Sequence, residues 1–78
     1  MEIIDYVSEL LKLSKEEAEK NSKKIDDNLT YYWNPIRGGI SVIVDNEGNY
    51  LTAVSSVKFE KLLETFKNGD KNKNFFQN

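Results

Sequence analysis

Residues 40–54 constrain the fold of this chain more than any other segment, because they carry the pattern of a β-hairpin. Two runs of mainly β-branched and aromatic residues, Ile40–Val44 and Tyr50–Val54, flank the segment Asp45–Asn49. Three turn residues that end in glycine suit a type I turn followed by a left-handed residue, a conformation that Gly48 adopts without a Cβ clash. Asp45 then faces Asn49, and the predicted cross-strand pairs are Val44 with Tyr50, Ile43 with Leu51, Val42 with Thr52, Ser41 with Ala53 and Ile40 with Val54.

Side chains alternate between the two faces of a strand, so this register also predicts the two faces of the hairpin. Both faces are partly apolar, and we therefore expect a helix to cover one of them and a groove or a partner to occupy the other. One face carries Ile40, Val42, Val44, Tyr50, Thr52 and Val54, and the other carries Ser41, Ile43, Leu51 and Ala53.

A third β-prone run, Thr30–Trp33, precedes the hairpin and ends just before Pro35. Proline removes a backbone donor and restricts the residue before it. We therefore expect the sheet to be either the antiparallel hairpin alone or a three-stranded meander in which Thr30–Trp33 is the edge strand. Pro35–Gly39 would be the connection, in which adjacent glycines allow backbone angles that a side chain forbids.

Two helices are predicted before this sheet. Apolar residues recur at helical spacing over residues 2–12, which predicts a helix with that stripe facing the core. Ser14 and Glu17 fit a capping box that starts a second helix, and Leu13 with Ala18 at the staple positions favours a break between the two helices. The stripe of the first helix consists of Ile3, Tyr6, Val7, Leu10 and Leu11.

The second predicted helix covers the charged residues 15–27, in which Ala18 and Ile25 are the sole apolar anchors. Its charged face either docks on a partner or is an ordinary solvated surface, and charge alone does not separate the two. The run Asp26–Asn28 lacks the alternating oxygens and the glycine of a calcium loop, so we interpret it as a helix end or a loop.

The best helical pattern lies at the C-terminal side of the hairpin. Ser55 and Ser56 offer an N-cap, Lys67 lies in the last turn, and Gly69 follows as a left-handed C-cap. The apolar stripe of this helix should pack on one face of the sheet. The stripe consists of Phe59, Leu62, Leu63 and Phe66.

The sequence therefore predicts one small α+β domain, residues 1–69, followed by a disordered tail, residues 70–78. The tail is polar apart from Phe75 and Phe76. The alternative to disorder is that these two phenylalanines dock on the body or on a partner. Domains of this size bury only about 60% of their unfolded surface. The chain has no cysteine or histidine to form a disulfide or a structural zinc site, so oligomerisation or a partner would supply additional stability.

Charge and hydropathy exclude several kinds of partner. Eleven basic and thirteen acidic residues leave a net charge of −2, which makes the chain a poor binder of duplex nucleic acid. An acidic surface instead suits a basic protein. No run approaches the roughly 18 apolar residues that span a bilayer, and residues 1–13 lack the basic start of a secretory segment. We expect no membrane contact and a cytoplasmic location.

The lack of histidine and cysteine removes the commonest general base, the thiol nucleophile and the usual transition-metal ligands. Ser41, Ser55 and Ser56 have no evident activating partner, and neither a nucleophile elbow nor a phosphate-binding loop is present. We therefore expect a protein without catalytic activity, cofactor or metal, with carboxylate chemistry as the one class left open.

The strongest candidate for a binding site is the cluster Tyr31, Tyr32, Trp33, Pro35 and Arg37. Aromatic residues and arginine dominate the energetics of protein interfaces, and closeness in sequence favours a shared surface. The competing interpretation places Tyr32 or Trp33 in the core and makes the following residues a simple turn. Arg37 beside two glycines could also bind an anion, and Tyr31 or Trp33 could stack on single-stranded nucleic acid.

About a third of the chain resembles small bacterial proteins, some of which are similar to immunity proteins of toxin systems. The resemblance implies a bacterial binding protein, and it assigns no functional residue. The residues that carry it are Trp33-x-Pro35-x-Arg37-Gly38-Gly39, then Val42-Ile43-Val44, Gly48, Tyr50-Leu51 and Ser55-Ser56.

Three hypotheses for function follow from the sequence. The first is a non-catalytic protein-binding or regulatory module, in one form a toxin-neutralising immunity protein, that occludes a surface with its acidic helix and its aromatic-arginine loop. The second is a homo-oligomeric structural protein, in which the second sheet face or the edge strand Thr30–Trp33 pairs with another copy. The third is a binder of small ligands or single-stranded nucleic acid that uses Trp33 and Arg37.

Overall fold

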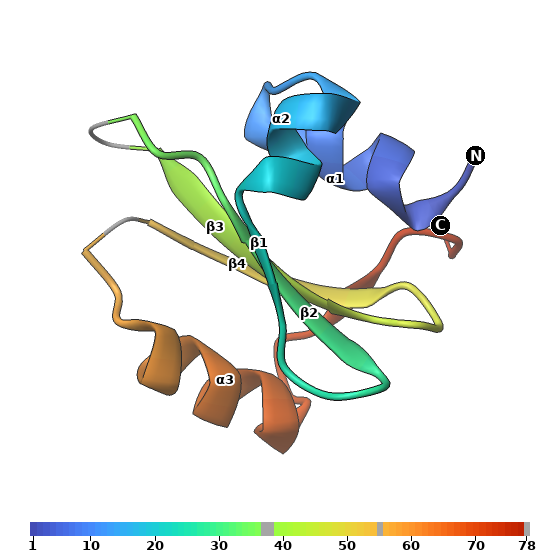
Figure 1. Ribbon diagram of the computed structural model, residues 1–78. Helices are drawn as coiled ribbons and strands as arrows, with labels where there is room; N and C mark the ends of the chain where they lie inside the picture. The colour runs from blue at the N-terminus through green and yellow to red at the C-terminus, as the bar shows by residue number, and fades with distance from the viewer. Residues whose placement is uncertain (37–38, 55, 78) are drawn as a thin grey trace.

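The computed structural model describes residues 1–36, 39–54 and 56–77. Within them an antiparallel five-stranded sheet lies between two helical layers, and its strand order follows the sequence (Figure 1). The predicted α+β class is confirmed, whereas the number of strands and the layout of the helices differ from the prediction. The elements are α1 (Ile3–Leu11), α2 (Lys15–Lys20), β1 (Ser22–Lys24), β2 (Leu29–Trp33), β3 (Ile40–Asp45), β4 (Asn49–Val54), α3 (Phe59–Asn68) and β5 (Lys73–Asn74).

The hairpin formed by β3 and β4 has the predicted register at every pair from Val44 with Tyr50 to Ile40 with Val54. Gly48 takes the left-handed conformation, with φ of +91°, and its N–H donates to the Asp45 carbonyl at 3.2 Å. The Asp45 carboxylate accepts the backbone N–H of Asn49 at 2.9 Å. The turn is therefore closed by local hydrogen bonds, which explains why its geometry could be predicted.

Both faces of the sheet are covered by helices, so the expectation of a groove or a partner on the second face is wrong for the sheet centre. On one face Val42 and Val44 form a core cluster with Val7 and Leu11 of α1. On the other face α3 completes a second cluster. The buried members of the second cluster are Leu29, Ile43, Leu62 and Phe66.

The strand β2 is not the edge strand that the sequence predicts, because β1 pairs along its outer side, with Lys23 opposite Tyr31. Helix α2 accordingly ends at Lys20, and the helix predicted to extend over residues 15–27 is wrong beyond this point. Ile25 is the one apolar residue of residues 21–27, so a longer helix would bury little more apolar surface. Pairing with β2 instead satisfies the backbone groups of β1.

The turn from β1 to β2 is made by an aspartate side chain. The Asp26 carboxylate accepts the backbone N–H groups of Asn28 at 2.8 Å and of Leu29 at 3.0 Å. Such side-chain bonds to nearby amides stabilise turns and compete with helix. Asp26–Asn28 is therefore a loop, which is one of the two structures predicted for it.

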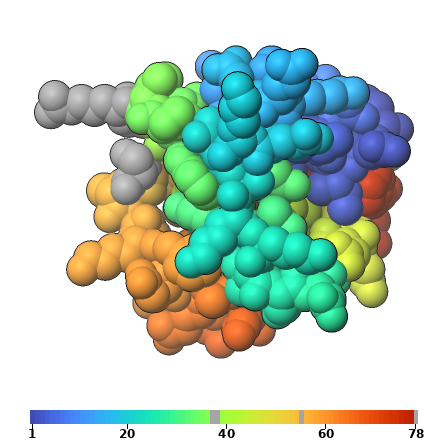
Figure 2. Space-filling view, in the orientation of Figure 1, coloured from blue at the N-terminus to red at the C-terminus, as the bar shows by residue number. Residues whose placement is uncertain are grey.

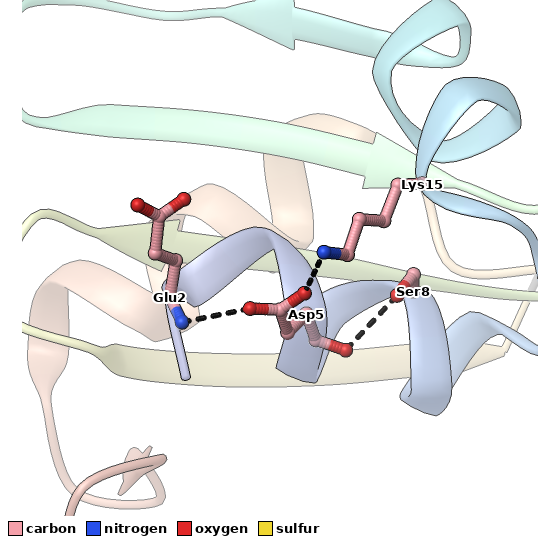
Figure 3. Close-up of polar contacts among 4 residues, drawn as sticks. All are labelled: Glu2, Asp5, Ser8 and Lys15. Atoms are coloured by element: carbon pink, nitrogen blue, oxygen red, sulfur yellow. Dashed lines mark hydrogen bonds and ion pairs between the residues drawn. The ribbon is translucent and has the colours of Figure 1, made fainter.

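The break between α1 and α2 is confirmed. Lys12 has a left-handed backbone with φ of +60°, and Ser14 caps α2 by accepting the Glu17 N–H at 3.1 Å. The predicted capping box is only half formed, because the Glu17 carboxylate accepts the Ser14 hydroxyl rather than the Ser14 amide. An ion pair between Asp5 of α1 and Lys15 of α2 joins the two helices (Figure 3).

Helix α3 ends as predicted and begins later than predicted. Gly69 is its left-handed C-cap, with φ of +80°. The N-cap position is Lys58, which makes no side-chain capping hydrogen bond. Of the two serines proposed as caps, Ser55 lies outside the described residues, and Ser56 precedes the helix by three positions.

The residues predicted as a disordered tail contain structure that ties them to the body. β5 pairs with the start of β4, with Asn74 opposite Asn49. Phe75 stacks between Tyr6 of α1 and Tyr50 of β4, as the alternative of docking on the body proposes. The polar composition of residues 70–77 conceals this, because asparagine side chains anchor the segment as well as the Phe75 ring: Asn72 donates to the Phe66 carbonyl and Asn74 to the Glu47 carbonyl.

Candidate functional site

Three aromatic rings meet on the α3 side of the sheet. Tyr31 stacks on Trp33 with ring centres 5.5 Å apart, and Phe59 meets Tyr31 edge to face at 4.9 Å. Tyr31 and Trp33 are two positions apart on β2 and therefore share a face. Phe59 is the first residue of α3, so the patch joins a strand to a helix terminus.

Lys23 adds a positive charge to this group of rings. Its pairing with Tyr31 places Lys23 on the same face, and its ammonium nitrogen lies 5.6 Å from the centre of the Phe59 ring. A cation over an aromatic face at this distance is attracted by the ring quadrupole. We call Lys23, Tyr31, Trp33 and Phe59 the aromatic patch; together they line a surface pocket of about 360 Å³.

The aromatic patch borders β1, the strand at one edge of the sheet. Figure 2 shows this side of the molecule, with β1 in cyan between the N-terminal helices and α3 in orange. Lys23 and Lys24 are exposed, while the three aromatic rings are half-buried. The patch therefore presents apolar ring surface beside positive charge.

Tyr32 does not belong to this surface, although the sequence grouped it with its neighbours. It points to the opposite face, where it packs against the core cluster formed by α1 and β3. Burial, followed by the negative charge of Glu19, raises the pKa of the Tyr32 hydroxyl above its ordinary value of 10.0. The competing interpretation of a core residue therefore holds for Tyr32.

The loop that follows Trp33 is held by the side chain of Asn34. The Asn34 amide donates to the Leu11 carbonyl at the end of α1 at 2.8 Å, and its oxygen accepts the Ile36 N–H at 3.1 Å. Gly39 closes the loop by donating to the Ile36 carbonyl at 3.0 Å. A Cβ at Gly39 would lie 2.7 Å from the Asn34 carbonyl oxygen, so this close approach requires glycine.

This anchored loop displays apolar residues. Pro35 is exposed and Ile36 is 65% exposed. Arg37, the remaining residue of the predicted site, lies outside the described residues, as does Gly38. On the α1 side, Ile36 also borders a smaller pocket of about 250 Å³, which is lined by Leu10, Leu11, Lys12, Asn34, Ile36, Gly39 and Ile40.

Sequence reasoning thus located the β2–β3 end of the sheet but missed part of its surface. The sequence predicts a helix at Lys23 and places Phe59 in the core stripe of the C-terminal helix. The two-residue spacing of Tyr31 and Trp33 could have shown that they share a face without Tyr32. Nothing local indicates that Phe59 would join them, because that contact depends on where α3 lies.

Two further properties bear on the kind of protein. Among the described side chains, no group of three or more histidine, cysteine, aspartate or glutamate residues could hold a metal ion. None of the helices in the described ranges is long and apolar enough to cross a bilayer.

Together these features define a small α+β protein, in which a five-stranded antiparallel meander lies between two N-terminal helices and one C-terminal helix. The surface at the β2–β3 end combines stacked aromatic rings, a lysine and an anchored apolar loop. No protein-family model, curated protein or solved structure matches the chain.

Proposed function

We propose that this chain is a small, non-catalytic protein-binding module whose partner contacts the β2–β3 end of the sheet. The observation that carries the proposal is the aromatic patch, in which the Tyr31 ring contacts both Trp33 and Phe59. Lys23 lies over the Phe59 ring. Aromatic side chains are strongly enriched among the residues that dominate binding energy in protein interfaces. Their large surface is available here at a low entropic cost, because the rings already hold one another in place.

The loop beside the patch supports a protein partner. Hydrogen bonds of the Asn34 side chain and of the Gly39 N–H hold the described parts of the loop in place, which reduces the entropy lost on binding. The loop presents Pro35 and Ile36, two residues that contribute no charge and would gain from burial in an interface. The loop follows Trp33, the last residue of β2, so it lies at the same end of the sheet as that ring.

The same geometry is less suited to a small ligand or a nucleic acid strand. Within the described ranges four side chains line the pocket of the patch, whereas small-molecule sites enclose most of the ligand surface. Tyr31 already stacks on one side of the Trp33 ring, which leaves less ring surface for a base. Among the residues that the structure describes, Lys23 is the single cation that lines the pocket, and a stacking site for nucleic acid needs a positively charged groove.

The finer proposal is a bacterial toxin-neutralising immunity protein that acts by surface occlusion. Its support is the acidic character of the N-terminal helices, which suits a basic partner. Residues 1–20 carry six acidic and three basic side chains. Asp5 is paired with Lys15, and the other acidic side chains of this segment are exposed: Glu2, Glu9, Glu16, Glu17 and Glu19.

Affinity purification of the tagged chain from its native host, followed by mass spectrometry, tests the general proposal. We expect one stoichiometric protein partner. Trp33→Ala and Tyr31→Ala should each weaken binding of that partner about tenfold or more by calorimetry. Phe76→Ala is the matched control, because it removes an exposed ring near the opposite end of the sheet, and its affinity should match that of the wild type.

Two results would count against the proposal. One is wild-type affinity in both patch variants, with their folding verified by circular dichroism. The other is a large change in tryptophan fluorescence on adding single-stranded oligonucleotide, with no protein recovered from the host. The immunity proposal has its own test, since growth beside an adjacent toxin gene should depend on this chain and on Trp33.

A further inference from the structure

Lys23 brings a positive charge into the aromatic patch that the described chain does not neutralise. Its ammonium nitrogen lies over the Phe59 ring, 5.6 Å from the ring centre. Within residues 1–36, 39–54 and 56–77 the one ion pair joins Asp5 to Lys15, so no described carboxylate pairs with Lys23. An ammonium group forms its strongest hydrogen bonds with carboxylates. The patch therefore offers a partner both apolar ring surface and a positive charge.

The residues that surround the patch add positive rather than negative charge. Lys58 directly precedes Phe59, is exposed and makes no side-chain capping hydrogen bond. The acid that follows Phe59, Glu60, borders a separate pocket on α3 with Leu63 and Glu64. β2 contains no charged residue, and the charged residues of β1 are both lysines. The elements that build the patch are therefore positively charged.

The other end of the same sheet has the opposite charge. The β1–β2 loop lies against the β3–β4 turn, where the Asn46 side chain donates to the Asp27 carbonyl at 2.9 Å. Residues 25–28 and 45–49 contain no lysine or arginine. Their carboxylates are Asp26, Asp27, Asp45 and Glu47. An acidic segment is thus attracted to the patch and repelled from the turn end, which fixes where and in which direction it binds.

We propose that the partner presents an acidic segment to the aromatic patch, in which a carboxylate pairs with Lys23 and a neighbouring large apolar side chain covers the rings. The inference rests on the proposed function and specifies the chemistry of its partner. The pocket of about 360 Å³ accommodates the apolar side chain, and burial of ring surface supplies the affinity. Lysine is a compact point charge, so aspartate and glutamate serve equally.

A basic segment is disfavoured at this surface, although the acidic N-terminal helices suit a basic partner. A cation brought to the rings would meet the ammonium group of Lys23, and like charges that face each other across an interface are destabilising. α1 and α2 lie on the other side of the sheet from α3 (Figure 1). The two sides of the molecule therefore suit oppositely charged parts of one partner.

Synthetic peptides test the inference without the native partner. Trp33 is the only tryptophan of the chain, so its fluorescence reports binding at the patch. The probes are capped peptides without tryptophan, in which glutamates, glutamines or lysines flank a central phenylalanine. The glutamate peptide should bind about tenfold more tightly than the glutamine peptide, and the lysine peptide should bind more weakly than either. Added salt should reduce this preference, because it screens exposed charges.

Variants of Lys23 identify the charge that is responsible. Lys23→Gln should abolish most of the preference for the glutamate peptide, and Lys23→Glu should reverse it in favour of the lysine peptide. Lys71→Glu is the matched control, because it makes the same charge change at an exposed site beyond the C-terminal end of α3. This control should bind all three peptides like the wild type. Circular dichroism verifies that each variant is folded.

Three results would overturn the inference. They are equal affinity of the wild type for the glutamate and glutamine peptides, no binding of the glutamate peptide at millimolar concentration, and an unchanged preference in Lys23→Gln. Failure of the proposed function looks different, since the host partner would then bind the Trp33→Ala and Tyr31→Ala variants like the wild type. A host partner that requires Trp33 but binds Lys23→Glu as tightly as the wild type overturns the inference alone.

Discussion

Phe75 lies parallel to Tyr50, with ring centres 3.8 Å apart and an angle of 5° between the ring planes. Tyr6 stacks on Phe75 at 5.1 Å, so three rings connect β4, the C-terminal segment and α1. The backbone N–H of Phe75 also donates to the Gly48 carbonyl at 3.0 Å. The C-terminal segment therefore fastens the first helix to the tip of the hairpin.

Phe75→Ala should reduce the free energy of unfolding by about 2–3 kcal/mol. This is below the range for a fully buried phenylalanine, because Phe75 is half-buried. Urea denaturation followed by circular dichroism measures it. Phe76→Ala, which removes a ring that is 51% exposed, is the control and should cost less than half as much. Equal losses would show that the stacks of Phe75 on Tyr6 and Tyr50 contribute no more than the edge-to-face contact of Phe76 with Tyr6.

Gly48→Ala should destabilise the protein by more than Gly69→Ala. Both glycines have positive φ, which costs an alanine about 1–2 kcal/mol. At Gly48 the added Cβ would also lie 2.6 Å from the Phe76 ring, whereas at Gly69 nothing lies within 4 Å. A double-mutant cycle with Phe76→Ala checks the cause. The excess cost at Gly48 should shrink when the ring is removed, and additivity would contradict this explanation.

The ion pair between Asp5 and Lys15 predicts a pH dependence of stability. Lys15, through its hydrogen bond, and then the Glu2 backbone N–H lower the pKa of Asp5 below its ordinary value of 3.8. The contribution of this carboxylate is present above pH 3.8 and is lost as the pH falls through the lower pKa of the folded state. The Asp5 hydrogen bond raises the pKa of Lys15 above 10.5, so its contribution is lost as the pH rises through that higher value.

Urea denaturation at a series of pH values checks this pair. Asp5→Asn should flatten the loss of stability below pH 3.8 relative to the wild type. Since the Lys15 side chain is 62% exposed, added salt should weaken the effect. Glu16→Gln is the control, because Glu16 is exposed and is not part of the Asp5–Lys15 pair. This variant should show the same dependence of stability on pH as the wild type. An unchanged profile in Asp5→Asn would exclude the pair as the cause.

Asn34→Ala should loosen the β2–β3 loop and lower stability by about 1–2 kcal/mol, since it removes two side-chain hydrogen bonds. Asn34→Asp tests the two hydrogen bonds separately. Aspartate can still accept the Ile36 N–H, but it places a carboxylate against the Leu11 carbonyl. Urea denaturation should therefore rank both variants below the wild type. Wild-type stability in Asn34→Asp would show that the bond to α1 contributes nothing.

The sequence was informative wherever one short segment contains all the determinants of its structure. The register of the hairpin follows from Gly48 and the Asp45 side chain, which lie within four residues of each other. The break after α1 follows from the cap at Ser14, and the end of α3 follows from Gly69. Each of these signals acts through hydrogen bonds or backbone angles inside one turn.

Tertiary structure determined the features that depend on distant partners. Ser22–Lys24 forms a strand because it pairs with the outer side of β2. Phe75 is held in place because its ring stacks between Tyr6 and Tyr50. The aromatic patch likewise required α3 to bring Phe59 against β2. Local propensity cannot specify such contacts, because their free energy comes from burial and pairing between segments that approach each other only in the folded chain.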